Sequence, residues 1–251
     1  MRTPILLAFF LMSASANAVE RVVQETIPVN PDVRFSIESS RGELEITTGS
    51  VDAIEITVYI EHDEQKVVDE VAINIDRELS DVAVRVGYDD PADNVDFDFI
   101  GLRDYDYPEI RFVIVLPDAA SLKIEAHRSQ LDIAAPAGRI DIDTSRSTGR
   151  ITGVRNDFEI VTTRGNYDIE IQELHDVDVE GQRSNIRLDI FAMTDFTLSG
   201  ETSRGNLRIT GQDIVAQDRE RGERVDYVSG TGSGFVSFDV ERGDLQLNFR
   251  N

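Results

Sequence analysis

Hydrophobic and polar residues alternate with a period of two along almost the whole chain after residue 21. Clear examples are the segments 34–38, 53–58, 71–75, 82–86 and 110–116. Such alternation, together with abundant Ile, Val, Thr and Phe, predicts strands that bury one face. The only helix that the pattern predicts is a short turn at residues 64–69. We therefore expect an all-β protein.

A short motif recurs seven times: Arg, then Gly or Ser, a polar residue, and apolar residues at alternate positions. Its copies begin at Arg41, Arg128, Arg146, Arg164, Arg183, Arg204 and Arg242. The copy at Arg146 carries Gly149 in the first apolar position. From Arg128 to Arg204 the steps are 18, 18, 19 and 21 residues, and another short alternating strand lies between copies. The repeating unit of about 19 residues is therefore strand, corner, strand and loop.

Such short strands cannot bury an apolar face alone, but stacked units bury a continuous column, which is the principle of a solenoid. We expect a β-solenoid, a β-helix-like stack of short strands, over residues 118–251. Residues 19–117 have longer, irregularly spaced strands and are expected to form a β-sandwich-like N-terminal cap. The alternative is a sandwich of short hairpins. The step of 38 from Arg204 to Arg242 suggests one more unit, disguised by an insertion around residues 219–234.

The residue after each motif arginine suits a sharp corner. Gly or Ser at this position supplies either a positive φ or a bond from side chain to backbone. The next residue is Asn at positions 166, 185 and 206. Stacked Asn side chains at equivalent corners are therefore expected to hydrogen-bond from unit to unit.

The N-terminus has the features of an export signal. Arg2 is followed by an apolar stretch at residues 5–12 and by Ala16-Asn17-Ala18, an A-x-A cleavage site. The apolar stretch is far shorter than a transmembrane helix needs, and no later segment is suited to span a bilayer as a helix. We expect a signal peptide over residues 1–18, cleavage after Ala18, and a periplasmic or secreted product.

Composition excludes several classes of function. The formal net charge of −23 argues against nucleic acid or an anionic membrane as the partner, since both require clustered Lys and Arg. The absence of Cys removes disulfides, thiolate catalysis and cysteine zinc sites. The three histidines, His62, His127 and His175, lack metal-ligand spacing, and His127 and His175 are expected at the surface. We expect neither a metal nor a cofactor.

An acidic loop at residues 89–106 carries the oxygen ligands that calcium prefers. Its spacing matches neither an EF-hand nor the glycine-rich nonapeptide repeat that binds calcium. We expect a solvated acidic loop, with calcium binding as the alternative.

Stacking of the units would align the corner arginines in a ladder with a repeat of about 4.8 Å. The candidate binding residues of this ladder are Arg128, Arg146, Arg164, Arg183 and Arg204. An unpaired ladder would attract a carboxylate-rich or sulfated polymer. The other interpretation, which we favour from the sequence, is a structural ladder neutralised by nearby acids. The candidate acids are Asp143, Asp168, Glu180, Glu201 and Asp244.

Two segments carry a resemblance to a known family. Residues 113–124 read as a strand that ends in Pro117, a small polar link and a first repeat unit, and residues 35–46 read as an opening hairpin. They resemble a family of bacterial exported or membrane-tethered β-repeat proteins, a domain of unknown function labelled "putative adhesin". The resemblance implies an exported, adhesin-like β-solenoid, and the family offers no established catalytic residues to carry over to this chain. The family usually has Ser-Gly at the corner, whereas this chain has Arg-Gly or Arg-Ser.

The sequence therefore favours an exported, non-enzymatic protein of the cell envelope that acts as a binding or scaffolding surface. Its expected partner is an envelope or extracellular polymer or protein. The alternative is a polysaccharide lyase or hydrolase on the same scaffold, which would need carboxylates that converge with an unpaired arginine.

Overall fold

The computed structural model describes residues 18–88, 107–191 and 195–250. The protein is all-β, as predicted, and the short helix α1 (Gln65–Glu70) lies where the sequence placed it. Most of the predicted signal peptide and the predicted acidic loop fall on residues 1–17 and 89–106, which lie outside the described residues. Within the described ranges, no helix is long and apolar enough to cross a membrane.

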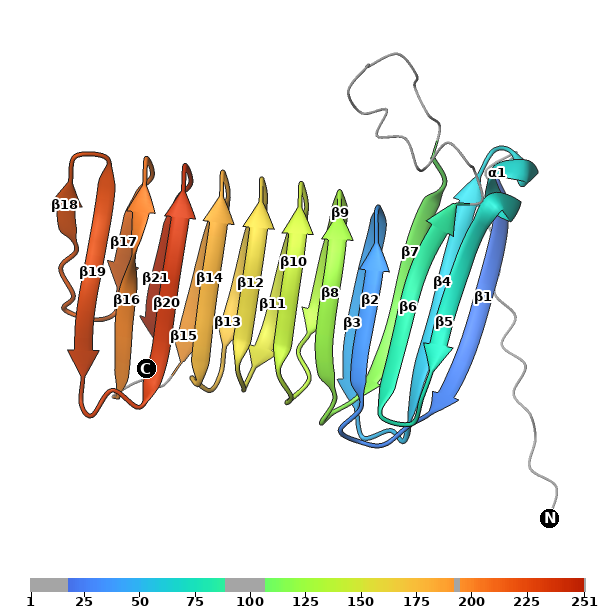
Figure 1. The fold of residues 1–251 in the computed structure, drawn as a ribbon, viewed down its shortest axis with the longest axis horizontal. Helices are drawn as coiled ribbons and strands as arrows, with labels where there is room; N and C mark the ends of the chain where they lie inside the picture. The colour runs from blue at the N-terminus through green and yellow to red at the C-terminus, as the bar shows by residue number, and fades with distance from the viewer. Residues whose placement is uncertain (1–17, 89–106, 192–194, 251) are drawn as a thin grey trace.

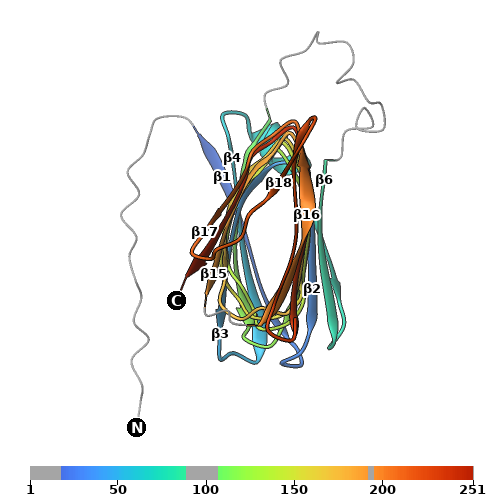
Figure 2. The ribbon, with the colours of Figure 1, turned by 90° about the vertical axis from the view of Figure 1, so that its left-hand side faces the viewer.

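Two large sheets face each other and enclose one elongated core (Figures 1 and 2). The first sheet has ten strands, in the spatial order β1 (Val19–Pro28), β4 (Ala53–His62), β7 (Glu109–Pro117), β3 (Gly42–Gly49), β9 (Ser129–Ala134), β11 (Thr148–Val154), β13 (Asn166–Ile171), β15 (Asn185–Phe191), β21 (Leu245–Arg250) and β17 (Leu207–Thr210). The second has eleven, in the order β18 (Gln217–Arg219), β19 (Gly222–Ser229), β16 (Phe196–Ser203), β20 (Gly234–Glu241), β14 (Asp176–Gln182), β12 (Phe158–Thr163), β10 (Ile140–Ser145), β8 (Ser121–His127), β2 (Arg34–Ser39), β6 (Asp81–Tyr88) and β5 (Val71–Arg77).

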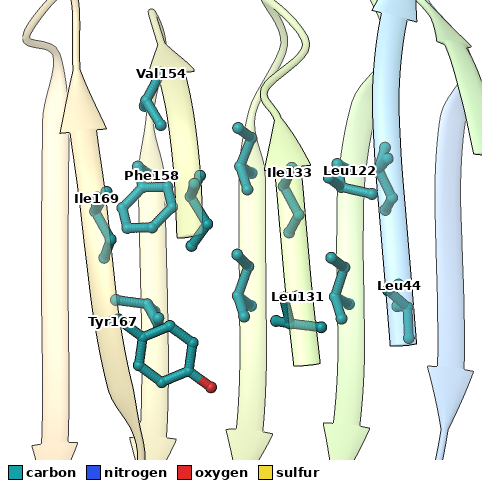
Figure 3. Packing of buried hydrophobic residues seen from close by; sticks show 14 of the residues in the cluster. Leu44, Leu122, Leu131, Ile133, Val154, Phe158, Tyr167 and Ile169 are labelled. Atoms are coloured by element: carbon teal, nitrogen blue, oxygen red, sulfur yellow. The ribbon is translucent and has the colours of Figure 1, made fainter. Parts of the chain in front are cut away.

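The period-two alternation of the sequence becomes alternate burial along the strands. The core consists of Ile, Val, Leu and Phe from both sheets, and its largest fully buried side chains include Phe35, Phe112, Phe158 and Phe196. Figure 3 shows the two inner faces interdigitating around Phe158 and Tyr167. Each fully buried side chain of this size contributes about 1.5–3 kcal/mol, so packing stabilises the cysteine-free chain.

From β8 onward the chain winds as parallel coils, each with one strand in the second sheet, a corner, and one strand in the first sheet. Ile140 of β10 pairs with Leu122 of β8 and Phe158 of β12, each 18 residues away. The arrangement of two large, mostly parallel sheets is that of a β-solenoid-like protein.

The last coil of the chain does not lie at the end of the stack. β20 lies between β14 and β16, and β21 lies between β15 and β17. The coil at residues 234–250 is therefore inserted between the coils at residues 176–191 and 196–210, which follow one another in sequence. The expectation of a disguised unit around residues 219–234 was wrong: β18 and β19 form an antiparallel hairpin, and β19 pairs antiparallel with β16.

The two sheets continue across residue 117, because β2 pairs with β8 and β3 pairs with β9. The division into an N-terminal cap at residues 19–117 and a repeat region at residues 118–251 stays a prediction.

Charged side chains link the outermost strands β1 and β5. Arg21 donates to the carbonyl oxygens of Val68 (3.1 Å) and Val71 (2.7 Å), and Arg77 pairs with Glu25 (3.0 Å). Inward-pointing charges of this kind disfavour edge-to-edge aggregation.

Candidate binding edge

Six of the seven motif arginines have a left-handed backbone, with φ between 47° and 62°. They are Arg128, Arg146, Arg164, Arg183, Arg204 and Arg242. Each lies at a corner between the two sheets, along the upper edge of the column in Figure 1. The backbone N–H of Arg164 donates to the carbonyl of Gln182 (2.8 Å), and that of Arg183 donates to Glu241 (2.6 Å). The corners are thus joined from coil to coil by main-chain hydrogen bonds.

The positive φ lies on the arginine at these six corners and not on the following glycine, which corrects the sequence interpretation. Only at the first corner does a glycine take it, where Gly42 has φ 132°. A side chain at Gly205 would overlap with the carbonyl oxygen of Gly243, so that glycine is required by close backbone packing.

Serine at the corner forms the predicted bonds to backbone. Ser129, Ser147 and Ser184 are buried, and their hydroxyls donate to carbonyl oxygens two residues earlier at 2.8–3.2 Å. The hydroxyl oxygen of Ser147 also accepts from the N–H of Ser129 on the preceding coil (3.1 Å). These buried bonds fix the corner geometry that presents the arginines.

Backbone geometry alone does not explain arginine at these positions. A left-handed conformation costs a non-glycine residue about 1–2 kcal/mol, and among non-glycine residues Asn and Asp tolerate it best. The side chains of the six arginines are nevertheless exposed to solvent. An unfavourable backbone conformation that carries an exposed charged side chain indicates a role for that side chain.

The expected neutralisation of the ladder by neighbouring acids is not what the structure shows for three of its members. In the part of the chain that the structure describes, Arg164, Arg183 and Arg204 form no ion pair. Arg242 pairs with its neighbour Glu241 (3.4 Å).

The candidate acids lie away from the corner edge or have other partners. Asp143, Glu180 and Glu201 lie on the outer face of the second sheet, and Asp168 lies on that of the first, because each alternates with inward-facing residues along its strand. Asp244 accepts a hydrogen bond from the Asn206 side chain (2.8 Å).

Four successive corners contribute no acid of their own to the edge, and we call them the arginine band. Residues 127–130, 145–148, 163–166 and 182–185 read HRSQ, SRST, TRGN and QRSN. None of these sixteen residues is Asp or Glu, although the chain has 48 acids against 25 bases. Three steps between neighbouring strands give the band a length of about 14 Å. Acids stand at both ends: Glu43 on one side, Glu241 and Asp244 on the other.

Polar side chains other than carboxylates flank the arginines on both sides. His127 and Ser145 hydrogen-bond across neighbouring coils (2.9 Å). On the other flank, Asn185 donates to Asn166 (2.9 Å), which confirms the predicted stacking of Asn side chains at this pair. Beyond Asn185, the row of hydrogen bonds between Asn residues passes through Asp244 of the inserted coil before it reaches Asn206. The order of the motifs in the sequence did not indicate this break in the row.

The order of the motifs in the sequence predicts that Arg204 lies next to Arg183, and the candidate binding residues do not include Arg242. The insertion puts Arg242 between them, since its N–H donates to Ser203 (2.6 Å) while Arg183 bonds to Glu241. The recurrence of the motif at Arg242 was the only sequence signal for this position. Arg41, at the other end, lies over the ring of Tyr107 at 4.1 Å.

The band offers a planar, permanently charged group on each coil, with hydrogen-bonding side chains beside it. Guanidinium groups bind carboxylate, sulfate and phosphate through two parallel hydrogen bonds. Over the described ranges, no group of three His, Asp or Glu side chains is arranged to hold a metal ion.

No family model and no curated protein matches the chain. Several solved structures do match the chain. A putative cell adhesion protein from Clostridium sporogenes matches at 11% identity over 92% of this chain and 99% of its own, with a TM-score of 0.49. Putative adhesins from Parabacteroides merdae (10% identity, 90% and 96% coverage, TM-score 0.33) and Bacteroides fragilis (11%, 90% and 97%, 0.34) match as well. These three structural neighbours are bacterial proteins described as a putative cell adhesion protein or as putative adhesins, as the sequence resemblance predicted.

Proposed function

We propose that this protein is an exported, non-enzymatic binding protein of the cell envelope whose arginine band holds an anionic polymer. The observation that carries the proposal is the band itself. Four exposed arginines, each in a left-handed conformation, stand on successive coils without an acid among sixteen corner residues of a chain with net charge −23.

The geometry favours a linear ligand with repeated negative groups. Neighbouring arginines are one strand spacing apart, about 4.8 Å, along a straight edge. A carboxylated or sulfated polysaccharide lying along this edge would place anionic groups on the guanidinium groups. Its hydroxyls would meet the flanking side chains, such as Thr163, Gln182 and Asn185.

The charge of the whole chain acts against indiscriminate binding. A net charge of −23 repels polyanions at distances beyond the Debye length, whereas the band attracts them only in close contact. This combination selects ligands that fit the edge over polyanions in general.

Binding is tested by a screen of acidic polysaccharides against the wild-type protein and a double variant, Arg164→Ala with Arg183→Ala. The matched control is Arg150→Ala with Arg208→Ala, which removes the same charge from exposed positions on the outer face of the first sheet. We expect the band variant to lose binding and the control to keep it. Equal affinity in both variants would refute the proposal.

The same incubations test the enzymatic alternative. A surface depression at the far end of the column combines Glu201 and Glu220 with Arg219 and Arg221. New reducing ends or unsaturated products, lost in Glu201→Gln and Glu220→Gln but retained in the band variant, would favour a carbohydrate-active enzyme.

A further inference from the structure

The inserted coil occupies a slot whose two walls have matching registers. The slot is the space between the coils at residues 176–191 and 196–210. Val177 and Leu198 both pair with Val236, and Ile186 and Leu207 both pair with Leu245. In both sheets, the two wall residues that pair with the same residue of the inserted coil are therefore 21 positions apart in the sequence (198 − 177 and 207 − 186). Two coils that are consecutive in sequence and aligned in register are held apart by a segment from later in the chain.

The inserted coil fills the slot with apolar side chains and bonds to both walls. Its buried residues are Val236, Phe238, Val240, Leu245, Leu247 and Phe249. The side chain of Asn248 donates to Asp189 on one wall (2.7 Å), and its oxygen accepts from Thr210 on the other (2.8 Å). A coil that simply left the slot would expose all six apolar side chains, a cost that an isolated chain cannot offset.

An identical coil from a second copy would satisfy every one of these contacts. The inserted coil is joined to the preceding β19 only through residues 230–233, in which Gly230 and Gly232 have φ of 61° and 76°. These four residues cross the end of β16, because β19 and β20 pair with its two edges. They form the hinge at which the coil of one copy can be redirected to another.

One carboxylate holds this hinge closed. Asp195, directly before β16, accepts hydrogen bonds from the Thr231 hydroxyl (2.6 Å) and from the N–H groups of Gly232 (2.5 Å) and Ser233 (3.2 Å). These bonds fold the hinge over β16. They belong to the closed chain and are lost when the hinge extends toward a second copy.

We propose that two copies of this chain exchange their 234–250 coils, so that each copy's coil fills the slot of the other. Reciprocal exchange of this kind gives a closed dimer at low cost, because the two states differ mainly at the hinge. The dimer carries two arginine bands, which would raise avidity for a polymer. That consequence rests on the proposed function, whereas the exchange itself does not.

The test uses the full chain, which has no native Cys. Glu180 on β14 and Asp239 on β20 are exposed register partners, at a strand spacing that a disulfide can bridge. The double variant E180C/D239C should form a disulfide within one chain and so validate the geometry. A mixture of the two single variants E180C and D239C, refolded together at high concentration, should give a heterodimer joined by a disulfide between the two introduced cysteines. Asp178→Cys with Ser237→Cys is a second pair.

The control mixture is D143C with V161C, whose strands β10 and β12 belong to consecutive coils that are not interrupted. Asp195→Ala should raise the heterodimer fraction several-fold, since it removes bonds that only the closed hinge makes. The proposal fails if the double variant cross-links within the chain but neither mixture exceeds the control. Polymer binding by the monomer would be unaffected by that result, so the two proposals fail separately.

Discussion

The ring of Tyr167 occupies the space that a side chain on Gly149 would need. The two residues are register partners on β11 and β13, and a Cβ atom at Gly149 would lie 2.8 Å from Tyr167 Cε1. Gly149 stands at the first apolar position of its motif, where the other six copies carry Leu, Tyr or Ile. The Tyr167 hydroxyl bonds to the buried Thr144 hydroxyl (2.6 Å), and burial raises the pKa of Tyr167. The Tyr167 ring of one coil thus fills the core space that the glycine of the preceding coil leaves empty.

This pairing makes the two positions interdependent. Gly149→Leu should destabilise by about 1–3 kcal/mol through overpacking, and Tyr167→Leu should destabilise by about 2–4 kcal/mol through a cavity and the unpaired Thr144. In the double variant the leucine side chain introduced at position 149 fills part of the cavity, so the loss should be smaller than the sum by about 0.5–3 kcal/mol. Urea unfolding of the four proteins measures this coupling. Simple additivity would contradict the packing relationship.

The backbone of the arginine corners gives a second test. Arg164 has φ 62° and no ion pair among the described residues. Arg164→Gly should therefore keep the thermal midpoint or raise stability by up to about 1 kcal/mol, since glycine adopts this conformation freely. Arg164→Val should lower stability by about 1–2 kcal/mol, because a β-branched residue is least suited to it. A loss of about 1 kcal/mol or more in the Gly variant would instead favour the structural ladder of paired arginines.

The alternation of polar and apolar residues was enough to predict the all-β class and the short helix, because burial of one strand face is a local property. The corner motif likewise located the edge that carries the arginines. The position of the 234–250 coil could not be read from the sequence. RSNIRL from Arg183 fits against either RGNLRI from Arg204 or RGDLQL from Arg242, and the choice depends on buried side chains such as Phe238 and Phe249.

Two further details, the positive φ of the arginines and the absence of acids from the corners of the band, could not be predicted from the sequence for a related reason. Arginine is not a residue that a left-handed backbone favours, so the sequence predicts the positive φ at the neighbouring Gly or Ser. The acid-free character of the band depends on which residues align at the edge. An acid such as Asp168 is four residues from Arg164 in sequence but lies on the outer face of the sheet.

Export is tested by the mass of the mature chain. Strand β1 begins at Val19, directly after the expected cleavage site, and Val19 pairs with His62. We expect protein isolated from the envelope fraction to begin at Val19, as measured by intact mass. A chain that retains Met1 would contradict this. Ala16→Asp with Ala18→Asp should block cleavage, because the A-x-A site requires small residues.

The carboxylate of Asp189 should make stability depend on pH. Asp189 lies on β15 with 23% of its side chain exposed, and it accepts hydrogen bonds from Asn248 (2.7 Å) and Arg250 (3.0 Å) of β21. Burial by itself raises the pKa of Asp189, but the bonds from Asn248, Arg187 and Arg250 outweigh it and lower the pKa below its ordinary value. The folded state therefore binds the proton more weakly than the unfolded state does.

A carboxyl whose pKa is lowered on folding contributes stability above its unfolded pKa, near about 3.9, and loses this contribution as the pH falls through the folded pKa. Asp189→Asn should thus cost about 1 kcal/mol at about pH 7, and the difference from wild type should shrink below about pH 4. Urea unfolding of both proteins from about pH 2.5 to about pH 7 measures it. Asp168→Asn is the matched control, because it removes the same charge from an exposed position on the neighbouring β13, a strand that does not pair with the inserted coil. A difference for Asp189→Asn that stays constant with pH would show that the carboxylate charge contributes nothing to holding the inserted coil.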